Sequence, residues 1–78
     1  MYQYIATEEN PMIIDTSFCK SLADIKKEVI SHSAECSHIR TSYPNGFVVD
    51  MITLADKIIF ETNRKLIDCG NGKFTVSD

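Results

Sequence analysis

The sequence lacks the features that mark several functional classes. Its eight basic residues are scattered and form no basic stripe, which disfavours direct binding of a phosphate backbone. No apolar run approaches the length that spans a membrane, and no basic N-terminal region precedes a long apolar stretch, so we expect no signal peptide. The three widely spaced cysteines do not form the framework of a secreted disulfide protein. These absences favour a cytoplasmic protein with free thiols.

Signatures of catalysis, metal binding and phosphate binding are also weak. His32, Cys36 and His38 form a metal-like cluster to which Cys69 could add a ligand, but their spacing matches no standard zinc signature. Nothing in the sequence brings a cysteine together with a base and an orienting acid. The Gly-Asn-Gly stretch at 70–72 lacks the third glycine and the following helix of a phosphate loop, so it indicates a turn. We therefore expect no enzyme activity and no metal or cofactor.

The composition that remains is typical of one small globular domain covering residues 1–78. Hydrophobic residues make up 44% of the chain and charged residues 24%. A chain this short buries only a modest core. The net charge of −3 comes from acidic residues spread along the whole sequence and not from one block. This balance predicts a small acidic protein without an extended acidic tail.

Residues 22–36 are predicted to form the main helix. Ser21 is a candidate N-cap, and Asp24 lies at the third helical position, close to the capping-box pattern. Serines in the second half are poor helix formers and would let the last turn fray. The apolar residues that share one helical face are Leu22, Ile25, Val29 and Cys36. We expect this helix to cover one face of a sheet.

The rest of the chain has the alternation and the turn residues of short strands. The predicted strands are residues 2–6, 12–15, 38–43, 47–54, 57–62, 65–69 and 73–77. The Pro-Asn-Gly turn at 44–46 is the strongest hairpin signal. The residues predicted on the inner face are Ile39, Thr41, Tyr43, Phe47, Val49, Met51, Ile58, Phe60, Ile67 and Cys69. The predicted fold class is therefore α+β, with one main helix packed on a mostly antiparallel sheet.

One segment admits two interpretations. Residues 53–56 repeat the Ser/Thr-Leu-Ala-Asp pattern of residues 21–24, so a second helix could run over about 54–67. The β-branched residues Ile58, Ile59 and Thr62 favour a strand instead. We expect the strand and keep the helix as the alternative.

The predicted strand register organises both faces of the sheet. It places Ile39, Met51, Phe60 and Ile67 in one inner row. On the opposite face it sets Arg40 beside Asp50 and Asp50 beside Glu61. Directly opposed carboxylates cost stability. Either the register is wrong, or Arg40 bridges the acids in a structural ion network, or a basic partner relieves the repulsion.

This outer face suggests a binding function. Its apolar residues would be Val48, Ile52, Leu54, Ile59 and Leu66, and either the N-terminal strands cover them or another protein does. The residues predicted to bind a partner are Arg40, Asp50, Ile52, Ile59, Glu61 and Asp68.

The predicted function is a small, acidic, non-enzymatic protein-binding module that regulates or inhibits a larger protein or nucleoprotein partner. Such proteins are common in phages and mobile elements, for example as inhibitors of host defence. We expect neither direct nucleic-acid binding nor membrane contact. The alternative is a homodimeric structural or accessory protein that self-associates through the same outer face.

Overall fold

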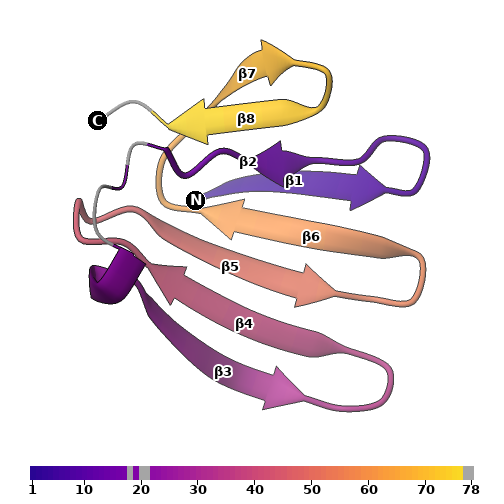
Figure 1. The fold of residues 1–78 in the computed structure, drawn as a ribbon. Helices are drawn as coiled ribbons and strands as arrows, with labels where there is room; N and C mark the ends of the chain where they lie inside the picture. The colour runs from indigo at the N-terminus through magenta and orange to yellow at the C-terminus, as the bar shows by residue number, and fades with distance from the viewer. Residues whose placement is uncertain (18, 20–21, 77–78) are drawn as a thin grey trace.

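The chain folds into two β-sheets. The computed structural model describes residues 1–17, 19 and 22–76, and these residues contain no α-helix. The strands are β1 (Tyr2–Thr7), β2 (Ile13–Ile14), β3 (Lys26–His32), β4 (Ser37–Ser42), β5 (Val48–Thr53), β6 (Lys57–Thr62), β7 (Leu66–Gly70) and β8 (Lys73–Val76) (Figure 1). A 3-10 turn, η1 (Leu22–Asp24), precedes β3. No helix in the described part of the chain is long and apolar enough to cross a membrane.

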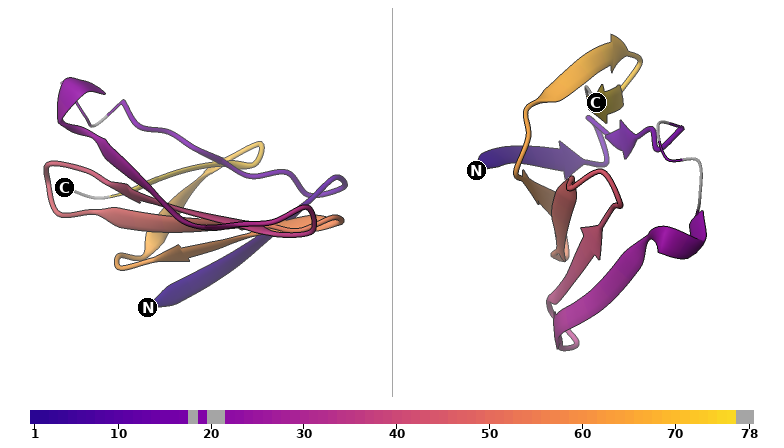
Figure 2. Two further views of the ribbon diagram at one scale, coloured as in Figure 1. Left: turned by 90° about the horizontal axis from the view of Figure 1, so that it is seen from below. Right: turned by 90° about the vertical axis from the view of Figure 1, so that its left-hand side faces the viewer.

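The two sheets differ in size and connectivity. The large sheet has the strand order β1-β6-β5-β4-β3, and all of its neighbouring strands are antiparallel. The small sheet has the order β2-β8-β7, in which β2 runs parallel to β8. The strands β3 to β6 form a meander of consecutive hairpins, whereas β1 returns from the start of the chain to pair with β6 (Figures 1 and 2).

The core lies between the small sheet and the β1–β6–β5 side of the large sheet. Its buried residues are Ala6, Phe47, Val49, Phe60, Leu66 and Val76. Tyr4 links the sheets, because its hydroxyl accepts a hydrogen bond from the Leu66 N–H at 2.9 Å and its ring lies 6.3 Å from that of Phe74. The core does not extend to β3, where Val29 is 64% exposed.

The hairpin turns expected between the predicted strands 38–43, 47–54 and 57–62 are confirmed. At residues 44–46 the Tyr43 N–H donates to the Phe47 carbonyl at 2.8 Å, and Gly46 takes a positive φ of 89°. The Asn45 side-chain oxygen accepts from the Phe47 N–H at 3.0 Å, as turn asparagines commonly do. At residues 55–56 the Leu54 N–H donates to the Lys57 carbonyl at 2.9 Å.

The β7–β8 hairpin is held against the segment that leads into β2. The Ile13 N–H donates to the Gly72 carbonyl at 2.8 Å. Gly72 has φ of +76°, and a Cβ atom there would lie 2.5 Å from the Pro11 carbonyl oxygen. Only glycine fits this approach without a shift of backbone.

A corner at residues 63–65 moves the chain from the large sheet to the small one. Thr62 is fully buried, and its hydroxyl donates to the Arg64 carbonyl at 2.6 Å. The Arg64 guanidinium in turn donates to the Asn45 carbonyl at 2.7 Å. The turn predicted at 63–64 therefore exists, but it does not join two strands of one sheet.

The predicted helix over 22–36 is wrong, and with it the α+β class: the fold is all-β. The candidate N-cap Ser21 lies outside the described residues, and residues 26–32 form β3. The β-branched Val29 and Ile30 are stiff in a helix. Ser33 also starts a tight turn, because its N–H donates to the Cys36 carbonyl at 2.8 Å and its hydroxyl accepts from the Cys36 N–H. That turn pairs β3 with β4 along its length.

Elsewhere the strand predictions are mostly confirmed. The predicted strands at 2–6 and 12–15 correspond to β1 and β2, although β1 extends the edge of the large sheet and does not cover its outer face. Residues 57–62 form β6, so the alternative helix over 54–67 is wrong. Tertiary pairing on both sides of β6 outweighs the weak capping pattern at 53–56.

The predicted inner row is confirmed for three residues and wrong for the fourth. Ile39 pairs with Met51 and Met51 with Phe60, whereas Ile67 pairs with Thr75 in the small sheet. Ile67 is 47% exposed, Cys69 is also exposed, and Leu66 takes the core position instead. The corner before β7 reverses which residues of that strand face inward.

Candidate functional site

The outer face is the side of the large sheet that points away from the small sheet. Residues opposite each other in an antiparallel pair share a face, so the register defines which side chains it carries. One row across it contains Gln3, Glu61, Asp50, Arg40 and Glu28. The next row contains Ile5, Ile59, Ile52 and His38. The core residues of the same strands lie on the other face.

Asp50 is the centre of the charged row and is held by Arg40. The Arg40 Nε donates to Asp50 Oδ1 at 2.8 Å, and Nη2 donates to Oδ2 at 3.4 Å. This two-pronged contact leaves Asp50 only 5% exposed, although it lies on an open sheet face. The hydrogen bond from Arg40 lowers the pKa of Asp50, and the same hydrogen bond raises the pKa of Arg40.

His38 approaches Asp50 from the same strand as Arg40. Its Nε2 lies 3.6 Å from Asp50 Oδ1, too far for a good hydrogen bond. This nitrogen is buried and has no hydrogen-bond partner among the described residues. The histidine thus helps to seal Asp50 from solvent, and a smaller contribution from it also lowers the pKa of the carboxyl group.

This geometry resolves how the sheet tolerates opposed carboxylates. Asp50 and Glu61 are paired as the sequence predicts, and Arg40 neutralises Asp50 directly. Both oxygens of Asp50 are engaged by Arg40, which suits a structural ion pair better than proton transfer. Glu61 at the side of this pair and the exposed Glu28 at the β3 end give the rest of the row an acidic character.

The apolar row lies beside the charged row. Ile5 is 53% exposed, and Ile52 and Ile59 are partly exposed. The three isoleucines occupy neighbouring strands in the order β1, β6 and β5, so they form a continuous strip. A strip of this kind next to acidic groups can contact an apolar surface that carries basic groups at its border.

The predicted partner-binding residues fall in two places. Arg40, Asp50, Ile52, Ile59 and Glu61 all lie on the outer face. Asp68 lies on β7 in the small sheet, where its Oδ1 accepts from the Gly70 N–H at 2.8 Å. Asp68 therefore lies in a different sheet from the other five, because the chain crosses to the small sheet before β7 begins.

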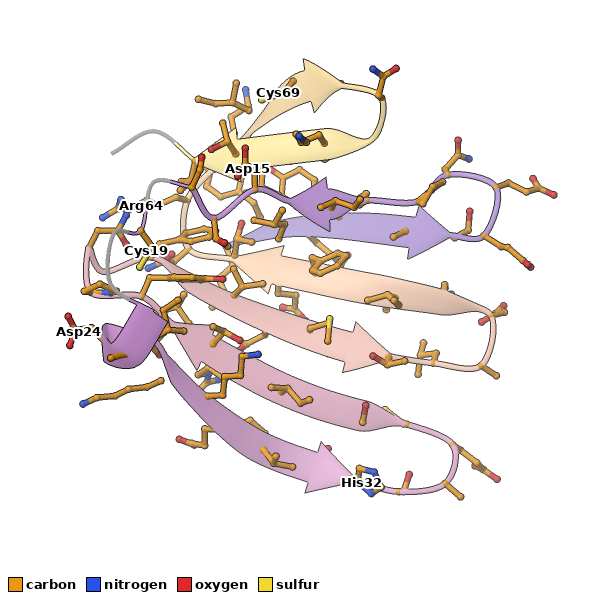
Figure 3. All side chains as sticks on the ribbon, viewed as in Figure 1. Asp15, Cys19, Asp24, His32, Arg64 and Cys69 are labelled. Carbon is orange, nitrogen blue, oxygen red and sulfur yellow. The ribbon has the colours of Figure 1, made fainter. Side chains whose placement is uncertain are left out.

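The metal-like residues are not brought together. His32 ends β3 and Cys69 lies on β7, far from each other in Figure 3. Cys36 follows His32 across the β3–β4 turn, and His38 lies beside Asp50. The described residues contain no group of three or more His, Cys, Asp or Glu side chains that could hold a metal ion.

Sequence reasoning missed Ile5 and Glu28 as outer-face residues. Ile5 alternates with the inward Tyr4 and Ala6, which is a strand signal, but its pairing with Ile59 is non-local. Glu28 was assigned to a helix and in fact lies opposite Arg40. Recognition of the hairpin turn at 33–36 would have placed Glu28 on this face, but no local signal would have placed Ile5 there.

Comparisons with protein-family models, with curated proteins and with solved structures each found no match.

Proposed function

We propose that this chain is a small, non-enzymatic protein-binding module that regulates or inhibits a larger protein or nucleoprotein partner. The observation that carries the proposal is the outer face, where a strip of one exposed and two partly exposed isoleucines lies beside an acidic row. The small sheet packs on the inner face and leaves this strip open in the described part of the chain. We place the protein in the cytoplasm, in the size class common among phage and mobile-element regulators.

The charge of the outer face defines the partner. Arg40 is committed to Asp50, so Glu28 and Glu61 supply the outward charge of this row, while Lys26 and Lys57 lie in other rows of the same face. An acidic row beside an apolar strip favours a protein with an apolar patch bordered by lysine or arginine. A basic groove that normally receives nucleic acid has these properties, and occupying it would inhibit the partner.

Site-specific photo-crosslinking in the native host tests the proposal. A photoreactive residue is placed at Ile59 on the outer face, and at Ile13, which is 63% exposed on the small sheet, as the control. We expect one protein to be captured from position 59 and not from position 13. The purified partner should then bind the unmodified chain and lose binding to Ile59→Asp. Equal capture from both positions, or normal binding of Ile59→Asp, would contradict the proposal.

A homodimer is the second candidate function, favoured by the exposure of the isoleucine strip itself. In that case two copies would bury Ile5, Ile52 and Ile59 against each other. Neutralising Glu61 should tighten self-association, and Ile52→Asp should produce monomers. Sedimentation velocity at increasing concentration separates this candidate from the first one, which requires a monomer in the absence of partner.

A further inference from the structure

A groove lies at the edge of the large sheet opposite β3. It has a volume of about 580 Å³ and separates β1 and the loop after it from the β7–β8 hairpin. Its apolar lining comes from Tyr4, Ile5, Met12 and Phe74. Glu9 and Asp68 supply its charged groups, and no lysine or arginine of the described chain lines it. The site therefore combines apolar walls with a negative rim.

The groove lies along the free edge of β1. Tyr4 and Ile5 are consecutive, so their side chains point to opposite faces of the sheet. Both line the groove, which is possible only where the groove meets the edge of the strand between the two faces. β1 stands at the end of the strand order of the large sheet, and β7 stands at the end of the small one. The groove thus lies between the edge of β1 and the β7–β8 hairpin.

The hydrogen bonds around β6 show which backbone groups face each way. The Leu54 N–H donates to the Lys57 carbonyl, and the Asn63 N–H donates to the Val48 carbonyl. In an antiparallel pair, hydrogen-bonded and non-bonded residues alternate. The odd-numbered residues of β6 therefore direct their N–H and C=O groups to β5, and the even-numbered residues direct theirs to β1.

The same alternation fixes the free edge of β1. Tyr4 is paired with Phe60, an even-numbered residue that faces β1, so the even residues of β1 bond to β6. The odd residues Gln3 and Ile5 direct their N–H and C=O groups away from β6. Thr7 follows this pattern, because its N–H donates to the loop after β1 at 3.1 Å. β1 therefore offers strand-pairing groups beside an apolar groove.

We propose that this groove binds an extended protein segment that carries both apolar residues and lysine or arginine. The segment adds a strand to β1 through Gln3 and Ile5, which is a common mode of peptide recognition. Its apolar side chains pack against Tyr4, Met12 and Phe74, and its basic side chains meet Glu9 and Asp68. The site shares only Ile5 with the rows described on the outer face, and the inference does not require that face to bind a partner.

The test uses a capped heptapeptide of alternating valine and lysine, added to the isotope-labelled protein and followed by NMR. We expect saturable shifts at the amides of Gln3, Ile5 and Asp68. A heptapeptide of alternating valine and glutamate should bind at least about tenfold more weakly, because its charges meet two carboxylates of the same sign. Equal binding of the two peptides, or no saturable shift on β1 at millimolar peptide, would overturn the proposal.

Matched variants separate charge from backbone pairing. Glu9→Gln with Asp68→Asn should weaken the lysine peptide about threefold to tenfold, as loss of two exposed ion pairs does. Glu8→Gln with Asp56→Asn makes the same change of net charge beside a different pocket and should leave affinity within about twofold. If both pairs weaken binding equally, the peptide responds only to net charge and the groove is not its site.

The backbone contact has its own control. Ile5→Pro removes an N–H at the sheet edge, where proline is tolerated, and should weaken binding more than about tenfold. Ile5→Ala keeps that N–H and should lose much less. A peptide N-methylated at alternate residues tests the same contact without changing the protein, and one of its two methylation patterns should abolish binding. Undiminished binding of both methylated peptides would refute strand addition, as would a peptide response confined to β3.

Discussion

Phe60 and Asp50 are almost equally buried, at 8% and 5% exposure, yet they lie on opposite faces of the large sheet. Phe60 belongs to the core that the large sheet shares with Leu66 and Val76 of the small sheet. Asp50 is covered from within its own layer, chiefly by Arg40 at 2.8 Å. The inner face is thus covered by the small sheet. On the outer face only Asp50 is covered, by Arg40, and the residues around this pair remain available for contact.

The largest expected effect comes from the inner face. Phe60→Ala should lower the free energy of unfolding by about 3–5 kcal/mol, because the second layer cannot collapse fully into the cavity. In a domain of this size such a loss could abolish folding. Urea melts measure it, with Ile59→Ala, the neighbouring residue on the outer face, as the smaller-effect control. A loss below about 1 kcal/mol for Phe60→Ala would place the core elsewhere.

A second test asks which residue at the start of β7 belongs to the core. Leu66→Ala should cost about 2–5 kcal/mol, because Leu66 is buried in the core. Ile67→Ala should cost less than about 1 kcal/mol, since Ile67 is half-exposed and faces away from the core. The same melts compare the two variants. A larger loss of stability for Ile67→Ala than for Leu66→Ala would support the predicted register, in which residues 65–69 continue the large sheet.

On the outer face, the stabilisation that the Arg40–Asp50 ion pair contributes should depend on pH. Asp50→Ala should cost about 1–3 kcal/mol by removing charge-assisted hydrogen bonds. The pKa of Asp50 in the folded chain lies below the ordinary value of 3.8, so its ionised form is the one that folding favours. This stabilisation is complete above about pH 4 and is lost as pH falls through the lower folded value.

Melts of wild type and Asp50→Asn at neutral and acidic pH isolate this contribution. Wild type should lose more stability on acidification than the variant, so the difference between the two should shrink below about pH 4. A difference that is constant with pH would mean that Arg40 does not hold the ionised carboxylate in the native state.

The smallest effect is expected beside the ion pair. Glu61→Gln should change the free energy of unfolding by less than about 0.5 kcal/mol, because Arg40 already neutralises the opposing Asp50. Partner association should nevertheless slow, and the difference should diminish at high salt because steering by exposed charge is screened. A stabilisation above about 1 kcal/mol would show that the two carboxylates still repel each other.

Those features of the two faces that short turns determine could be predicted from the sequence, and those that depend on distant contacts could not. The turns at 44–46 and 55–56 set the register of β4, β5 and β6, so the pairs of Asp50 with Arg40 and Glu61 could be deduced. The tight turn at Ser33–Cys36 contains neither glycine nor proline, so the sequence pattern predicts a helix where β3 lies. The corner at 63–65 depends on the contact between Arg64 and the distant Asn45, which no local pattern reveals.

The position of β1 in the large sheet also shapes how the chain must fold. β1 pairs with residues 57–62, whereas β3, β4 and β5 each pair with the next strand along the chain. Short-range hairpins close quickly, and long loops close slowly. We expect the meander to form first and β1 to dock late, which pulse-labelled hydrogen exchange would detect as delayed protection of Tyr4 and Ala6. During synthesis, β1 therefore leaves the ribosome without its partner strand and must remain unpaired until most of the chain has followed it.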